Sequence, residues 1–123
     1  MVNALHKTIM ELSKLKAWEL KELLLKKEIS SVEVVSSIFD QIKEKNERIN
    51  AYISLMEVYA KNLAREIDEK RGKNQNLGIL AGIPIAIKDN ICAKGFPTTC
   101  GSMILENFIP PYDATVIEWL KKD

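Results

Sequence analysis

The sequence has few of the residues that carry metal and disulfide chemistry. It contains two cysteines, Cys92 and Cys100, and one histidine, His6, in 123 residues. Two cysteines are too few for a disulfide scaffold, and the distant histidine completes no metal-binding spacing with them. We therefore expect both thiols to be free, reduced and packed as small hydrophobic side chains, and we expect no metal or cofactor to be bound by this chain.

Long hydrophobic runs and a strong charge bias are also missing. No apolar stretch approaches the 18 residues of a membrane-spanning helix, and the N-terminus is amphipathic rather than signal-like. The 18 basic and 17 acidic residues leave a net charge of +1, so charge alone implies neither nucleic acid nor acidic lipid as a partner. We expect a cytoplasmic protein with no membrane partner. Phosphate-binding loops and dinucleotide motifs are absent as well.

Glycine and proline are absent from residues 1–71, whereas all five glycines and all four prolines lie between Gly72 and Pro111. This contrast predicts a helix-rich first part and a second part rich in turns. Three stretches of the first part have apolar residues at helical spacing. They span residues 14–27, 30–47 and 57–71. Whether a helix through residues 5–12 is continuous with the first of them stays open.

Two of these helices have predicted boundaries. Ser30 is an expected N-cap, and Glu33 three residues later completes the pattern of a capping box. Gly72 is the expected stop of the third helix because glycine readily takes the backbone angles of a helix end.

Two segments have the pattern of β-strands. Residues 51–55 alternate apolar and polar side chains, and residues 82–88 are apolar on both faces until Lys88. A run that is apolar on both faces is typical of a strand inside a sheet. Asp113 is then expected to cap a last helix with inward-facing Val116, Ile117 and Leu120. A strand, a connection and a helix form most of a crossover unit, so we predict an α/β fold that is unfinished.

Lys88 is the candidate functional residue. The apolar run carries its ammonium group to the point where a loop begins, and a buried ammonium without a partner either costs free energy or loses its proton. Two interpretations of Lys88 are about equally supported. It is either a functional lysine or a structural one, whose stem packs while its ammonium reaches water or a carboxylate. A Schiff base is possible, but no phosphate cradle accompanies it. The remaining role is general base toward a serine.

A small, hydroxyl-rich segment follows the lysine, at residues 98–102, with Gly95 just before it. Small residues permit close backbone approach and hydroxyls relay hydrogen bonds, so this segment could pass close to Lys88. For Ser102, however, capping a short helix toward Asn107 is the favoured interpretation. Asp89 and Asn90 could orient a site, although such a pair is usually turn chemistry.

These residues resemble the N-terminal quarter of amidase-signature enzymes. The matching stretches are residues 28–33, 80–91, 98–102 and 105–116. Within that family the sequence is most similar to the A subunits of glutamyl-tRNA(Gln)/aspartyl-tRNA(Asn) amidotransferases. The resemblance implies that residues 1–123 are the N-terminal part of a single amidase domain, with helix-rich residues 1–71 and a strand and loop region at 72–123. The implied fold is an incomplete amidase-signature fold, in which N-terminal helices precede the first strands of a mixed sheet.

The resemblance also implies a catalytic role. The position that matches Lys88 is, in that family, a base toward a serine with a cis peptide bond, which activates a second, nucleophilic serine. Both serines belong to sequence beyond Asp123, so Lys88 is the one catalytic residue expected here, and the chain alone is expected to be inactive. The implied reaction hydrolyses glutamine and supplies ammonia for converting Glu-tRNA(Gln) to Gln-tRNA(Gln), or Asp-tRNA(Asn) to Asn-tRNA(Asn).

The implied partners are the B and C subunits of a heterotrimeric amidotransferase. Mischarged tRNA is reached through one of these partners, where ATP and magnesium are expected. Two alternatives remain beside this hypothesis. The chain could belong to another amidase-signature hydrolase of small amides, or it could be a non-catalytic helical interaction module in which Lys88 forms a buried structural ion pair.

Overall fold

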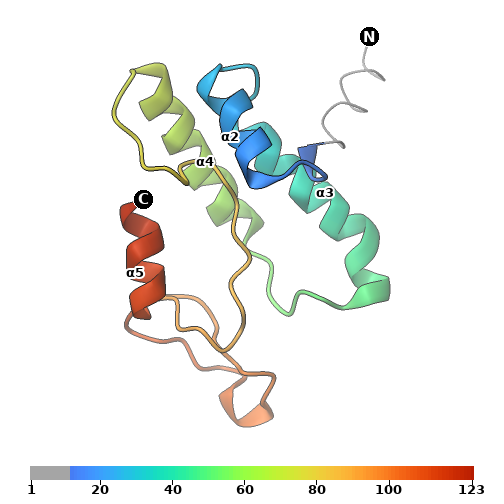
Figure 1. Cartoon of the computed structure of the whole chain (residues 1–123). Coiled ribbons are helices and arrows are strands. Elements are labelled where there is room, and N and C mark those ends of the chain that lie inside the picture. The colour runs from blue at the N-terminus through green and yellow to red at the C-terminus, as the bar shows by residue number, and fades with distance from the viewer. Residues whose placement is uncertain (1–11) are drawn as a thin grey trace. The chain divides into compact units, whose positions relative to one another are not determined.

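The computed structural model describes residues 12–123 (Figure 1). Its elements are α2 (Ala17–Leu25), α3 (Ser31–Ile49), α4 (Glu57–Gly72), the short 3₁₀ helix η1 (Met103–Leu105) and α5 (Thr115–Lys122). The chain divides into a first unit, Met1–Pro84, and a second unit, Ile85–Asp123. The predicted helix through Leu5 and Ile9 lies outside the described residues.

Helix α3 begins at the capping box that the sequence predicts. The Ser30 hydroxyl accepts a hydrogen bond from the Glu33 amide at 3.2 Å, and the Glu33 carboxylate accepts one from the Ser30 amide at 2.8 Å. Both bonds satisfy amides that have no partner within the helix. The helix ends at Asn50, whose φ of 54° is the left-handed conformation common at helix ends. The helix therefore extends slightly past Glu47, near which its end was predicted.

The core of the first unit lies on both sides of α3. One cluster joins Val35, Phe39 and Ile42 of α3 to Ala64 of α4, as the predicted apolar stripe requires. The other cluster joins Val34 of α3 to α2 through buried leucines, which are Leu12, Leu20 and Leu24. Burial of each such aliphatic side chain is worth about 1.5–3 kcal/mol, so packing rather than intrinsic propensity stabilises these helices.

The strand predictions are not confirmed, because residues 12–123 contain no β-strand. Residues 82–88 form no regular element, and the side chains of Ile85 and Ile87 are 47% and 45% exposed instead of buried. A strand exists only through ladder hydrogen bonds to a neighbour, and no described segment supplies that neighbour. Residues 51–55 are also irregular, since Tyr52 packs on the α3–α4 cluster and its amide donates to the Asn46 side chain at 2.9 Å.

The second unit is held together by irregular pairing of two segments. The amides of Gly95 and Thr98 donate to the carbonyls of Pro110 and Phe108, at 3.2 and 3.0 Å, and the Ala114 amide donates to the Cys92 carbonyl at 2.8 Å. The later segment thus runs antiparallel to the earlier one without forming a regular ladder. Helix α5 begins at Thr115, the residue after Ala114, so the hydrogen bond from Ala114 to Cys92 fixes the start of the helix.

Asp113 does not cap α5, contrary to the sequence prediction. Ala114 occupies the N-cap position, and Asp113 instead accepts from the Lys94 amide at 2.7 Å and from the Lys121 ammonium at 2.6 Å. The Lys121 ammonium, followed by the Lys94 amide, lowers the pKa of the Asp113 carboxyl. Its carboxylate therefore joins the paired segments to the end of α5.

The inward face predicted for α5 is present only in part. Ile117 is buried at 3% exposure, whereas Val116 is 45% exposed. Among the described residues, no helix has both the length and the hydropathy needed to cross a membrane.

Candidate functional site

Lys88 lies in the second unit and is exposed to solvent. Its carbonyl accepts a hydrogen bond from the Ile91 amide at 2.9 Å, which closes a turn immediately after the run of residues 82–88. Within residues 12–123 its ammonium group makes no ion pair. The burial predicted from the apolar run is therefore absent, and so is the buried ion pair of the non-catalytic hypothesis. The run is uncovered because no segment within residues 12–123 pairs with it as a strand.

The hydroxyl segment, residues 98–102, is attached to Asp89, the residue next to Lys88. One carboxylate oxygen of Asp89 accepts from the Thr99 amide at 2.9 Å, and the other accepts from the Thr99 hydroxyl and, at 3.3 Å, from the Gly101 amide. The Asp89 carbonyl also accepts from the Cys100 amide at 3.0 Å. These four bonds form what we name the Asp89 latch. They attach the hydroxyl segment to the residue that follows Lys88 in the chain.

The latch changes the pKa of the Asp89 carboxyl. The Thr99 hydroxyl, followed by the Thr99 amide, lowers the pKa of the Asp89 carboxyl below its ordinary value of 3.8. Hydrogen bonds donated to a carboxylate favour its charged form. Asp89 therefore stays ionised and keeps its hydrogen bonds to the loop over the neutral pH range.

The backbone of the latched loop takes an unusual conformation. Cys100 has a φ of 52° and Gly101 a φ of 64°, so two consecutive residues lie in the left-handed region. Cys100 is exposed, which makes the prediction of a packed thiol wrong for this residue, although both cysteines are free as expected. The Ser102 hydroxyl accepts from the Ile104 amide at 3.3 Å and begins η1, so its predicted capping role is confirmed.

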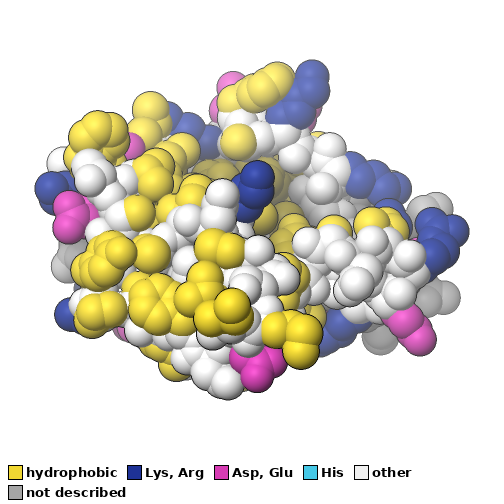
Figure 2. All heavy atoms as spheres, turned by 90° about the horizontal axis from the view of Figure 1, so that it is seen from below, with side chains coloured by type: hydrophobic (Ala, Val, Ile, Leu, Met, Phe, Trp, Pro, Cys, Tyr) yellow, Lys and Arg dark blue, Asp and Glu magenta, His cyan; other side chains and the backbone are white. Residues whose placement is uncertain are grey.

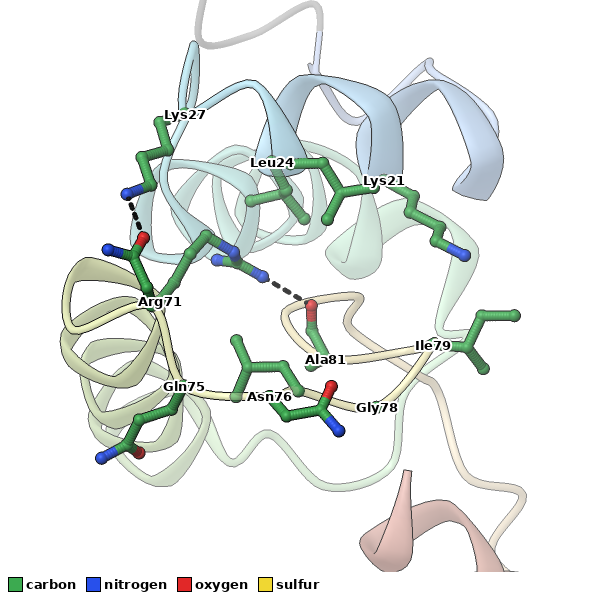
Figure 3. Close-up of a pocket in the computed structure, with 12 residues that line it drawn as sticks. Lys21, Leu24, Lys27, Arg71, Gln75, Asn76, Gly78, Ile79 and Ala81 are labelled. Atoms are coloured by element: carbon green, nitrogen blue, oxygen red, sulfur yellow. Dashed lines mark hydrogen bonds between the residues drawn. The ribbon is translucent and has the colours of Figure 1, made fainter.

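The start of the lysine run is fixed within the first unit by Arg71 at the end of α4. Its guanidinium donates to the Ser31 hydroxyl at 2.9 Å, to the Asp68 carboxylate at 3.1 Å and to the Ala81 carbonyl at 2.8 Å. Figure 3 shows Arg71 reaching the Ala81 carbonyl. Gly82 follows with a φ of 91°, and a Cβ there would collide with the Ser31 hydroxyl. Only glycine fits this position.

An open groove of about 460 Å³ lies beside this contact (Figure 3). Three cationic side chains line it, those of Lys21, Lys27 and Arg71, and none of its lining residues is acidic. Lys27 donates to the Asn74 side chain at 3.0 Å. Lys88 does not line this groove. Among the described residues, no group of three or more histidine, cysteine, aspartate and glutamate side chains could hold a metal ion.

Sequence reasoning missed most of this architecture. For Asp89 the sequence left two roles open, orienting a site or turn chemistry, and its carboxylate holds the hydroxyl segment. The available signal was a carboxylate next to the lysine, followed ten residues later by a threonine pair. Arg71 gave no signal, because its partners Ser31 and Ala81 are distant from it along the chain and belong to no recognisable motif with it.

Comparison with known proteins gives consistent relatives. The family model described as Amidase matches residues 33–123. The A subunit of a glutamyl-tRNA(Gln) amidotransferase from Carboxydothermus hydrogenoformans is 50% identical over 113 residues, which cover 92% of this chain and 23% of that protein. A subunits of enzymes with the same name from Clostridium acetobutylicum and Natranaerobius thermophilus are 47% and 50% identical, and the matches cover 24% and 23% of their lengths. The chain spans about a quarter of the length of these curated relatives.

Solved structures agree with the sequence matches. Two chains reported with a vestigial protein complex, studied for the evolutionary origins of an s-triazine catabolic enzyme, superpose with TM-scores of 0.82 and 0.83. The second comes from an inhibitor-bound complex. Each is 28% identical to this chain, and the match covers 88% of this chain and 24% of the solved one. From the family match over residues 33–123, which contain both Lys88 and the Asp89 latch, it follows that the chain belongs to the amidase family.

Proposed function

We propose that this chain is the lysine-bearing N-terminal part of the A subunit of a glutamine-hydrolysing tRNA amidotransferase. The observation that carries the proposal is the identity of about 50%, across nine-tenths of the chain, to proteins named as A subunits of glutamyl-tRNA(Gln) amidotransferases. Such a protein would release ammonia for making Gln-tRNA(Gln) from Glu-tRNA(Gln), or Asn-tRNA(Asn) from Asp-tRNA(Asn). The B and C subunits would be its partners, with ATP, magnesium and the mischarged tRNA bound by one of them in the cytoplasm.

In this proposal Lys88 is the general base. It accepts a proton from a serine with a cis peptide bond, and that serine in turn accepts the proton of a nucleophilic serine. The nucleophile attacks the side-chain carboxamide carbon of glutamine, ammonia leaves with the returned proton, and water then releases glutamate from the acyl-enzyme. Both serines would come from the three quarters of the relatives' length that this chain does not match.

In this proposal residues 82–88 pair with a neighbouring strand, which no segment of residues 12–123 provides. Ile85 and Ile87 are half-exposed here, and a neighbouring strand from the rest of an amidase fold would cover them and complete an α/β sheet. Removal of water around Lys88 would then favour the neutral, basic form of its amine. The Asp89 latch supports this arrangement, since it already fixes the hydroxyl segment to the residue that follows Lys88.

The test is reconstitution of activity. The purified 123-residue chain should hydrolyse no glutamine, because the nucleophile and the groups that stabilise its oxyanion are missing. Co-expression with the unmatched C-terminal part of the Carboxydothermus relative should restore ammonia release. Lys88→Ala should lower the reconstituted kcat by roughly 10²–10⁴-fold, the range for loss of a general base.

Lys94→Ala is the matched control, since Lys94 is also exposed in the second unit. It should leave kcat unchanged. Equal activity of the native and Lys88→Ala chains would disprove the role of the lysine. A preference for small aliphatic amides over glutamine would assign the chain to another amidase-signature hydrolase.

A further inference from the structure

The groove beside Arg71 gathers positive charge that the chain leaves uncompensated. We name it the α2 groove, because Lys21 and Leu24 of α2 lie on one wall and the loop of residues 74–81 forms the other (Figure 3). Among the described residues, neither Lys21 nor Lys27 makes an ion pair, and no acidic side chain lines the groove. A hollow lined by charge of one sign attracts ligands of the opposite sign.

The cations of the α2 groove stand at both of its ends. In Figure 3 Lys27 and Arg71 lie toward one end and Lys21 toward the other. Leu25 and Ile79 also line the groove and are 67% and 59% exposed, so apolar surface accompanies the charges. The groove differs in this from the face drawn in Figure 2, over much of which hydrophobic side chains gather. It suits a ligand that has negative groups at both ends and an apolar group as well.

The loop wall of the groove offers an unused stretch of backbone. The amides of residues 76–80 donate no hydrogen bond to any described residue, whereas the flanking amides of Gln75 and Ala81 are bonded within the chain, at 3.0 and 3.2 Å. Residues 76–80 belong to no helix or strand. Exposed backbone with free amides can pair with the main chain of an added peptide, as in the addition of a strand to a sheet edge.

We infer that the α2 groove binds an extended acidic segment of a partner protein. The main chain of the segment pairs with residues 76–79, and its carboxylates reach Lys21 and Lys27. An apolar side chain of the segment packs on Leu25 and Ile79. The groove lies within the first unit and does not contain Lys88, so the inference is independent of the proposed function.

Two other anionic ligands fit the groove less well. A free phosphate would occupy a small part of its volume of about 460 Å³ and would leave the apolar side chains in water. A single RNA strand binds largely by stacking its bases on aromatic side chains, and no described residue that lines the groove is aromatic. Only a peptide supplies charge, apolar surface and a main chain together.

The experiment titrates the ¹⁵N-labelled 123-residue chain with the blocked peptide Ac-Glu-Leu-Glu-Leu-Glu-NH₂ and follows the backbone amides by NMR at low salt. We expect the amides of residues 76–79 to shift to saturation and to exchange more slowly with solvent, because they gain acceptors. Replacing the glutamates of the peptide by glutamine should weaken binding by about fivefold, the effect of losing two exposed ion pairs. Methylation of the central peptide nitrogen should also weaken it, because the main chain then lacks a donor.

Variants of the chain test the same assignment. The double variant Lys21→Gln, Lys27→Gln should weaken binding of the peptide by about fivefold for the same reason. The matched control is Lys26→Gln, Lys73→Gln, which removes the same charge from exposed residues that do not line the groove. It should change the affinity by less than about twofold, since charges outside the contact are screened by solvent.

Several results would overturn the inference. They are equal binding of the glutamine peptide, equal effects of the two double variants, and shifts that leave residues 76–79 unmoved. Displacement of the peptide by inorganic phosphate or by oligouridylate of equal charge, or unchanged affinity of the methylated peptide, would show a general anion site instead. Loss of binding on co-expression with the C-terminal part of the Carboxydothermus relative would show that the amidase fold itself covers the groove.

Discussion

Asp89 shows what a single carboxylate does when it follows an apolar run. Its side chain accepts from two amides and one hydroxyl of the hydroxyl segment, and its carbonyl accepts from a third amide. The residue types could be read from the sequence, but the partners could not. Whether an aspartate caps its own turn or a loop ten residues away depends on where that loop lies, and nothing in the local sequence specifies this.

Asp89→Asn should loosen the latch without changing side-chain volume. The amide keeps one acceptor oxygen but loses the charge and the second acceptor, so the Thr99 and Gly101 amides lose their charge-assisted bonds. Hydrogen exchange at both amides, followed by NMR, should accelerate severalfold. Asp40→Asn, at an exposed position of α3, should leave both unchanged. Unchanged exchange in Asp89→Asn would show that the loop holds its shape without the latch.

The latch should also depend on pH in a defined direction. Because the folded pKa of Asp89 is lowered from 3.8, its stabilising effect is fully present above 3.8 and is lost as the pH falls through the lower folded value. The Thr99 amide shift should therefore remain native at pH 4 and change only in more acidic solution. A transition at or above pH 4 would contradict the lowered pKa.

At the scale of elements, the helices could be predicted and the strands could not. Helix α3 carries its own signals, which are the Ser30 capping box and an apolar stripe, and both are confirmed. The run at residues 82–88 has an equally clear strand pattern, but a strand depends on a partner and a helix does not. Asp113 failed as a cap because the Lys94 amide and Lys121 ammonium compete for its carboxylate.

Asp68→Ala should destabilise the junction of α3 and α4. The Asp68 carboxylate accepts from the Ser31 and Val32 amides, at 2.8 and 3.1 Å, so one helix caps the first turn of another. Its removal should lower the free energy of unfolding by about 1–3 kcal/mol, because buried donors lose their acceptor. Urea unfolding followed by far-UV circular dichroism measures this loss. The control Asp40→Ala should stay within about 0.5 kcal/mol of the native chain, as expected for exposed positions.

At the scale of the whole molecule, the chain combines the core of a small helical unit with many exposed large apolar side chains. Sequence similarity could predict the family, but it could not predict that Lys88 is exposed in this chain. In this structure Lys88 is exposed, and residues 12–123 form no strand beside it. The sequence next to Lys88 thus contains the residue that anchors the hydroxyl segment, Asp89, but no signal for the exposure of the lysine.

Self-association is the expected behaviour of the isolated chain. Met103, Ile104 and Trp119 offer large apolar side chains with no cover among the described residues, and such surfaces associate in water. Analytical ultracentrifugation should show concentration-dependent oligomers in the micromolar range, and a Met103→Lys, Ile104→Lys double variant should shift the distribution toward monomer. A native chain that sediments as a monomer throughout would refute this expectation.

The boundary between the two units falls between Pro84 and Ile85, inside the run of residues 82–88. Lys88 lies close to this boundary, is exposed and belongs to no helix or strand. The peptide bond that follows it is therefore a target for trypsin. Cleavage there would cut the chain near the junction of its two units, and a completed sheet would shield the same bond. Protection of the bond after Lys88 from trypsin would thus report whether the rest of the proposed enzyme has assembled around it.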